Sequence, residues 1–172
     1  MTTAPSTAPS SAFSTPSLAP VPALIVFTLR VALGGIFCLA AGTKISNPQS
    51  FWEAINAFKV TDNVEHSLLA THLLPWIELF AGLSLALGFW TREAAMIIGL
   101  LLLSFIWVII AAIGKGLAGV PCSCFGYWHL VCTGGVGWCK VFENSGLTAI
   151  AATLVFTGGG PISLDRVLKF GR

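Results

Sequence analysis

Charged side chains are scarce in this sequence. Only 9% of its 172 residues are Asp, Glu, Lys or Arg, whereas 55% are hydrophobic. Soluble domains carry about 25% charged residues, so this composition excludes a soluble globular enzyme. We therefore expect the lipid bilayer to be the main environment of the chain.

Basic residues are also few and scattered. Nine Lys and Arg stand against seven Asp and Glu, which gives a formal net charge of +2. A protein that binds nucleic acid concentrates its basic side chains in a patch that meets the phosphates, and the sequence has no such cluster. We expect no nucleic-acid partner.

Residues 1–20 lack charged side chains and consist almost wholly of Ser, Thr, Ala and Pro. Such a segment buries too little apolar surface to offset the entropy lost on ordering, which predicts a disordered tail. The tail also lacks the basic residues that open a secretory signal, and the following apolar run is longer than the core of such a signal. We therefore expect no cleavage after it.

Four apolar stretches follow the tail. They cover approximately residues 21–42, 68–90, 94–113 and 146–164. About 20 residues of helix cross the hydrocarbon layer, and these runs lack the two-residue alternation of barrel strands. The fourth run is the weakest, because it contains the helix-breaking sequence TGGGP at 157–161. The sequence predicts an all-α integral membrane four-helix bundle within residues 21–165 and a basic C-terminal end at 166–172.

With four spans, the loops at 43–67 and 114–145 lie on one side of the membrane and both termini lie on the other. The basic residues outside the spans divide evenly, as Lys44, Lys59, Lys115 and Lys140 against Arg92, Arg166, Lys169 and Arg172. This balance does not orient the protein. The C-terminal group of Arg166, Lys169 and Arg172 favours termini on the inner side, and disulfides persist in oxidising compartments. We therefore expect a multi-pass protein whose Cys-rich loop 114–145 lies on the oxidising side of the membrane.

That loop contains four of the five cysteines, namely Cys122, Cys124, Cys132 and Cys139. In a thiol–disulfide centre a thiolate attacks a disulfide, and a neighbouring thiol resolves the mixed disulfide. A disulfide between Cys122 and Cys124 closes a tight, strained ring that is easily reduced. The spacing therefore favours these two residues as a catalytic exchanging pair.

Other interpretations of the four cysteines stay open. Two structural disulfides, in any of three connectivities, would pin the loop without chemistry. In a mixed case, Cys132 and Cys139 form a disulfide staple or relay electrons while Cys122 and Cys124 exchange. A zinc site fits poorly, because the gaps of one, seven and six residues differ from the usual spacing of paired ligands, so we expect no metal.

Ionisable residues also occur within the apolar stretches. Such residues are costly in lipid and usually face the interior of a bundle. Counted from the same membrane face, Arg30 and Glu78 differ in depth by only about 5 Å, which predicts an Arg30–Glu78 pair. The pair would fix helix register, or would form a polar site for a quinone headgroup or for proton transfer. His72 lies nearer the loop side, where it would extend that path or sit at the membrane surface.

An ordered set of short motifs resembles a known family. The set comprises RVALGGIF at 30–37, GTK at 42–44 with NP at 47–48, LPWIE at 74–78 and CSCFG at 122–126. Together they make residues 22–157 similar to the MauE branch of the DoxX-like membrane proteins. The resemblance implies a four-helix architecture similar to that of quinone-linked disulfide-forming enzymes. It also implies that Cys122 and Cys124 are the redox pair. The family's polar membrane positions would be Arg30, Lys44 and Glu78.

The resemblance also implies a function and its partners. The family is associated with methylamine utilisation, where it is thought to assist maturation of the disulfide-rich small subunit of methylamine dehydrogenase beside a thioredoxin-like protein. We therefore expect a redox-associated maturation factor of the bacterial inner (cytoplasmic) membrane, with its Cys-rich loop in the periplasm. A periplasmic or thioredoxin-like protein is the expected partner, and a quinone is the candidate cofactor. The alternatives are a non-catalytic subunit that anchors or assembles a larger redox complex, and a DoxX-like quinone-linked subunit.

Two features depart from the family pattern. Cys132 and Cys139, with the glycine-rich stretch between them, resemble an insertion after the CSCFG motif. Glu143 precedes Asn144 at a place where the family leads us to expect a basic residue. These departures concern the partner and the substrate rather than the fold.

Overall fold

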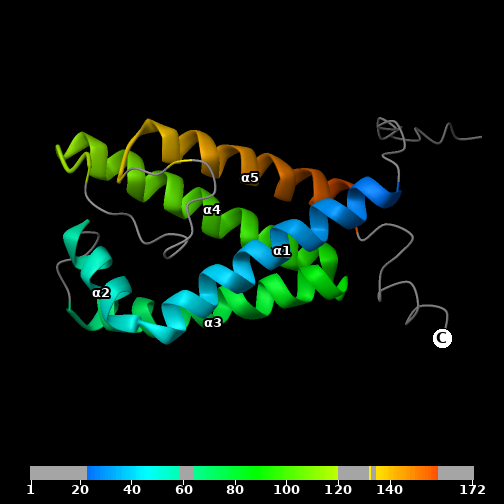
Figure 1. The fold of residues 1–172 in the computed structure, drawn as a ribbon, viewed down its shortest axis with the longest axis horizontal. Helices are drawn as coiled ribbons and strands as arrows, with labels where there is room; N and C mark the ends of the chain where they lie inside the picture. Colours follow the sequence, from blue (N-terminus) through cyan, green and yellow to red (C-terminus); the bar gives the residue numbers. More distant parts are fainter. Residues whose placement is uncertain (1–22, 59–63, 120–131, 133–134, 159–172) are drawn as a thin grey trace, which may run out of the picture.

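The computed structural model describes residues 23–58, 64–119, 132 and 135–158. Within these residues every regular element is a helix, as Figure 1 shows. The helices are α1 (Ala23–Ser46), α2 (Pro48–Ala57), α3 (Val64–Leu87), α4 (Thr91–Gly114) and α5 (Trp138–Thr157). The predicted all-α class is confirmed for this part of the chain. The predicted tail at 1–20, the pair Cys122 and Cys124, and the basic end at 166–172 lie outside the described residues.

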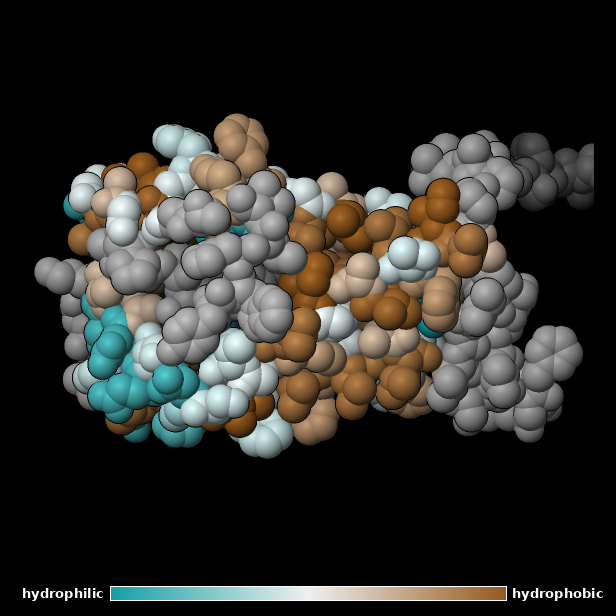
Figure 2. Space-filling model, in the orientation of Figure 1, coloured by the Kyte–Doolittle hydropathy of each residue, from teal (hydrophilic) through white to brown (hydrophobic). Residues whose placement is uncertain are grey.

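Three of the described helices are long and apolar enough to cross a membrane. They are α1, α3 from Glu65 and α4, with 24, 23 and 24 residues. Large apolar side chains project from them, including Phe80, Leu100 and Trp107, each more than 60% exposed. Figure 2 shows the resulting hydrophobic surface, with hydrophilic residues gathered at the end of the molecule where α2 lies. The chain is a multi-pass membrane protein.

The fourth expected span overlaps α5. This helix has 20 residues, but it is not among the three helices that are long and apolar enough to be candidate membrane spans. Its first two turns contain Lys140, Glu143 and Asn144, and these polar residues lower the hydropathy of the segment. In the structure their side chains are buried rather than exposed to the surroundings. The helix therefore supplies a polar site as well as apolar packing.

The long helices form two packed pairs. α1 packs mainly on α3, and α4 packs mainly on α5 (Figure 1). Contacts between α3 and α4 and between α1 and α5 join the two pairs. The shared core is apolar and includes the fully buried side chains of Leu33, Phe37, Leu85, Ile98, Leu102, Ile109 and Leu154. The two pairs thus share one apolar core, which holds the polar side chains at fixed positions.

Helix α2 is short and follows α1 directly. Pro48 occupies its first turn, where a missing amide hydrogen is tolerated, and Asn47 is the residue before it. Phe51, Ala54 and Phe58 are buried and recur at spacings of three and four residues, so they share one face. That face packs against α3 and brings aromatic rings to the end of α1.

Glycines allow α1 and α3 to approach closely. A Cβ atom on Gly34 would lie 2.6 Å from the carbonyl oxygen of Gly82 and 2.8 Å from the backbone nitrogen of Ala86. Conversely, a Cβ atom on Gly82 would lie 2.9 Å from the carbonyl oxygen of Gly34. The two backbones are therefore in contact, as in membrane helix pairs that pack through small residues.

We predict that Gly34→Ala destabilises the protein by about 1–3 kcal/mol, the usual cost of overpacking, because backbone atoms must move apart. Gly35→Ala is the matched control, since nothing lies within 4 Å of its added methyl group. Thermal unfolding in detergent, followed by circular dichroism, measures both variants. Equal melting temperatures for the two would contradict the close crossing.

Candidate functional site

A buried ion pair joins α1 to α3. The Lys44 Nζ atom lies 2.6 and 2.7 Å from the two carboxylate oxygens of Glu78, and it donates hydrogen bonds to both. Each side chain is only 1% exposed. Lys44 is in the last turn of α1 and Glu78 is near the middle of α3, so the pair ties one end of α1 to a fixed point on its neighbour.

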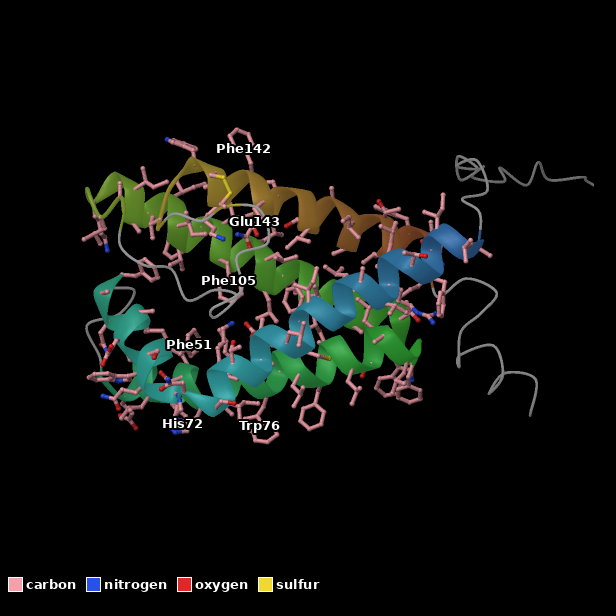
Figure 3. All side chains as sticks on the ribbon, viewed as in Figure 1. Phe51, His72, Trp76, Phe105, Phe142 and Glu143 are labelled. Atoms are coloured by element: carbon pink, nitrogen blue, oxygen red, sulfur yellow. A yellow bond between two sulfur atoms is a disulfide. The ribbon has the colours of Figure 1, made fainter. Side chains whose placement is uncertain are left out.

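Aromatic rings enclose the ammonium group of Lys44. Its Nζ atom lies 5.0 Å from the ring centroid of Phe51 and 5.1 Å from that of Phe105. A cation at this distance from a ring is attracted by the negative ring face. Figure 3 shows Phe51 on α2 and Phe105 on α4 directed into the space between these helices. The site is thus assembled from α1, α2, α3 and α4.

The expected Arg30–Glu78 pair is wrong. Both oxygens of Glu78 accept from Lys44, and the Arg30 guanidinium instead lies beside Gly88. Gly88 is ten residues from Glu78, or about 15 Å along a helix. The expected pairing counted depths from the edges of the apolar runs, whereas the glycine contact between α1 and α3 and the Lys44–Glu78 pair together set the actual register.

Arg30 occupies a structural position at the end of α3. Gly88 has a φ of 76°, and the backbone amide of Phe89 donates to the carbonyl oxygen of Ser84, which closes the helix. A Cβ atom on Gly88 would lie 2.6 Å from an Arg30 guanidinium nitrogen. A cation at a helix C-terminus is stabilised by the helix dipole, so Arg30 secures the turn between α3 and α4.

His72 is not brought to Glu78. Its side chain is exposed on the outer side of α3, as Figure 3 shows, and its Nδ1 atom lies 3.0 Å from the Leu68 carbonyl oxygen. Six residues separate His72 from Glu78, which places them on different faces of the helix. The expected extension of a polar path through His72 therefore has no geometric support.

An apolar cavity adjoins the ion pair. It has a volume of about 300 Å³ and is lined by α2, α3 and α4. Its walls include Phe51 and Phe105, the same two rings that contact Lys44, together with Ala54, Leu74 and Trp107. Hydropathy alone does not predict this cavity, because it assigns residues 48–57, which form α2, to the loop at 43–67. Proline after Asn47 and the spacing of Phe51, Ala54 and Phe58 were the available signals.

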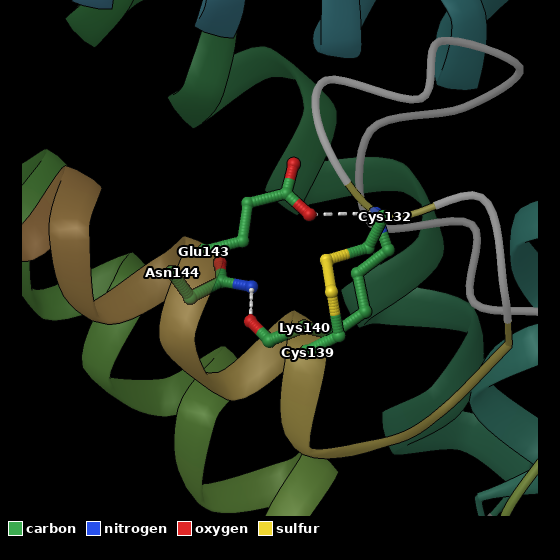
Figure 4. Close-up of a disulfide and its surroundings, with 5 residues drawn as sticks. All are labelled: Cys132, Cys139, Lys140, Glu143 and Asn144. Atoms are coloured by element: carbon green, nitrogen blue, oxygen red, sulfur yellow. Dashed lines mark hydrogen bonds and ion pairs between the residues drawn. A yellow bond between two sulfur atoms is a disulfide. The ribbon is translucent and has the colours of Figure 1, made fainter.

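A second polar cluster lies at the start of α5. Cys132 and Cys139 form a disulfide, with 6.0 Å between their Cα atoms. Beside it, Lys140 Nζ lies 2.9 Å from an oxygen of Glu143, and Asn144 Nδ2 donates to the Lys140 carbonyl oxygen at 2.8 Å (Figure 4). The disulfide therefore ties Cys132 to the first turn of α5, whereas the two polar contacts lie within the helix.

Other candidate ligands are sparse in the described part of the chain. Within residues 23–58, 64–119, 132 and 135–158, no group of three or more His, Cys, Asp or Glu side chains is placed to hold a metal ion. Cys38 is a free, partly buried thiol on α1, next to Gly82 of α3. Its position fits the expected small apolar filler between helices.

These features define a class, namely multi-pass helical membrane proteins with a buried ion pair and a cysteine-rich loop. Residues 22–157 match the family model described as methylamine utilisation protein MauE, and the chain belongs to this family. It is 26% identical over 148 residues to the methylamine utilization protein MauE of Paracoccus denitrificans, covering 86% of this chain and 76% of that protein. No solved structure matches the chain. The MauE resemblance predicted from the motifs is confirmed.

We predict that Lys44→Met lowers the free energy of unfolding by about 3–5 kcal/mol, because it leaves the Glu78 carboxylate buried without its partner. Lys115→Met is the control, since Lys115 is exposed beyond the end of α4. Denaturant titration in detergent, followed by circular dichroism, compares the two variants. A Lys44 variant as stable as the Lys115 variant would show that the ion pair contributes little to the fold.

Proposed function

We propose that this protein is a membrane thiol–disulfide oxidoreductase or maturation factor for a periplasmic redox enzyme. The family match over residues 22–157 carries the proposal. The Cys132–Cys139 disulfide supports it, because a disulfide in this loop fits an oxidising compartment. The Paracoccus relative is named for methylamine utilization, and the substrate that we propose from the family resemblance is the small subunit of methylamine dehydrogenase.

In this proposal Cys122 and Cys124 form the exchanging disulfide. A thiolate of the substrate protein attacks one sulfur of the pair, and the other sulfur leaves as a thiolate. A second substrate thiol then attacks the mixed disulfide. The substrate gains a disulfide, Cys122 and Cys124 become thiols, and two electrons and two protons move from substrate to enzyme. A thioredoxin-like protein or a quinone is the proposed acceptor in the following step.

The proposed membrane arrangement has four spans in a DoxX-like bundle. In it, α5 crosses the bilayer beside α1, α3 and α4, in the inner membrane, with the Cys-rich loop on the periplasmic side. Two observations support a fourth span. α5 packs along α4, and the polar side chains of Lys140, Glu143 and Asn144 are buried within the protein.

We predict that Cys122→Ser and Cys124→Ser abolish maturation while leaving membrane insertion and helical content unchanged, because serine removes the nucleophile but not the fold. The assay is the number of free thiols in a co-expressed methylamine dehydrogenase small subunit, counted by alkylation and mass spectrometry. Cys38→Ser is the control, since Cys38 lies between helices and is expected to be inert.

Unchanged maturation in both loop variants would contradict catalysis by this pair. Loss of the protein from the membrane would instead favour the alternative of a non-catalytic subunit that anchors or assembles a redox complex, because its cysteines would then only stabilise the loop. Helical content measured by circular dichroism separates these outcomes.

A second candidate function is a quinone-linked subunit, which the apolar cavity favours. A quinone is a flat, lipid-soluble ring whose carbonyl oxygens accept hydrogen bonds. The cavity offers about 300 Å³ of apolar space, and two of its walls, Phe51 and Phe105, contact the Lys44 ammonium group. Pockets of this kind, apolar with a few polar groups, are the usual form of small-molecule sites.

We predict that ubiquinone quenches the fluorescence of Trp107, which lines the cavity, in a saturable manner. Ala54→Leu should weaken this quenching at least roughly tenfold, because the larger side chain fills the space that the ligand occupies. Ala57→Leu on the same helix is the matched control, since Ala57 is exposed. Non-saturable quenching, or equal affinity in the two variants, would contradict a quinone site here.

A further inference from the structure

The ammonium group of Lys44 has one N–H group that its ion pair does not use. An ammonium group carries three N–H donors. Two of them are donated to the two carboxylate oxygens of Glu78, at 2.6 and 2.7 Å. Among the described residues no further acceptor bonds this group, and its other close neighbours are the ring faces of Phe51 and Phe105. The charges of the pair are matched, but one donor is left over.

This remaining donor lies at the inner end of the apolar cavity. Phe51 of α2 and Phe105 of α4 contact the ammonium group, and both rings also line the cavity. Figure 3 shows these two rings directed into the space between their helices. Leu74, another lining residue, precedes Glu78 by one helical turn on the same face of α3. Walls from three helices therefore meet at the ion pair.

The other polar groups of the cavity do not supply a donor at this end. Of the described residues that line it, only Ser104 and Trp107 have a side-chain hydrogen-bonding group. The Ser104 hydroxyl donates to the Leu101 carbonyl oxygen at 2.7 Å, so its hydrogen is already used. Trp107 is 66% exposed and therefore marks the outer side of the cavity. Lys44 is thus the donor at the buried end.

A donor at the end of an apolar cavity selects the chemistry of the ligand. A carbonyl oxygen that enters apolar surroundings loses its hydrogen bonds, and this loss is costly unless a donor in the site replaces them. Hydrogen bonds from a charged donor are the strong ones, and a carbonyl oxygen is a better acceptor than a ring face. A plain hydrocarbon gains nothing from the donor. The site therefore favours a carbonyl compound over a hydrocarbon of the same shape.

We propose that the Lys44 ammonium is the hydrogen-bond donor of this cavity, and that the cavity takes lipid-soluble aromatic molecules with a carbonyl oxygen. The carbonyl oxygen accepts the third N–H of Lys44 between the rings of Phe51 and Phe105. The apolar remainder of the ligand fills the space towards Trp107, while Glu78 holds the ammonium group through its other two hydrogens. This inference deepens the second candidate function, a quinone-linked subunit, and rests on it.

The test is the infrared spectrum of 1,4-naphthoquinone bound to the full chain in lipid nanodiscs. The two carbonyl groups of the free molecule are equivalent, so it shows one carbonyl stretching band. We expect two bands in the bound state, because the carbonyl that accepts from Lys44 is weakened and absorbs at lower frequency. Isotope labelling of the carbonyl carbons separates these bands from those of the protein.

The double variant Lys44→Met/Glu78→Met removes the donor without leaving a buried charge unpaired, so its fold is expected to persist. We expect its bound naphthoquinone to show a single carbonyl band and to bind about tenfold more weakly, as measured by quenching of Trp107. Naphthalene has the same two rings without oxygen, and competition should give it equal affinity for both proteins. Lys115→Met is the control variant, since Lys115 is exposed beyond the end of α4.

A single carbonyl band in the wild-type complex would overturn the proposal without reference to any variant. So would a double variant that keeps both the split bands and the wild-type affinity. In these two cases the quinone site itself would stand, because the ligand is still bound in a saturable manner. Absence of saturable naphthoquinone binding would refute the inference and the quinone-linked function together. None of these results depends on substrate maturation at Cys122 and Cys124.

Discussion

The fold depends on one buried charge pair in a low-dielectric environment. Neither Lys44 nor Glu78 can be left alone in the apolar interior, because an unpaired buried charge costs several kcal/mol. Their contact at 2.6 and 2.7 Å therefore fixes how α1 lies along α3. The same contact brings the end of α1, and with it α2, to the position where Phe51 meets the ammonium group. The apolar cavity beside Phe51 and Phe105 follows from this arrangement.

The two helix pairs each hold a polar site of a different kind. Between α1 and α3 the charges are fully matched, since both carboxylate oxygens of Glu78 accept hydrogen bonds. At the start of α5 the matching is incomplete, because Glu143 and Asn144 each keep an acceptor without a donor. A fully matched buried pair suits the maintenance of structure, and the Lys44–Glu78 pair has this form.

Apolar run length was enough to predict the helices α1, α3 and α4 and the all-α class, because lipid leaves few alternatives for the backbone. It could not predict which residue Glu78 contacts. Helix register depends on the backbone contact between Gly34 and Gly82 and on the Lys44–Glu78 pair, and both contacts join segments that are distant in the sequence. Apolar run length also does not predict α2, because this helix is short and gains its stability from burying Phe51 and Phe58. Cysteine spacing leaves three connectivities open for the four loop cysteines, so it could not predict that Cys132 pairs with Cys139.

A double-mutant cycle on Lys44 and Glu78, measured by unfolding in detergent, tests this account most directly. It compares Lys44→Met, Glu78→Met and the double variant. The account predicts that the double variant is more stable than either single variant, with a coupling energy of at least about 2 kcal/mol, because removing both charges leaves no buried charge unpaired. Simple additivity of the two single changes would contradict the claim that this pair holds α1 in register with α3.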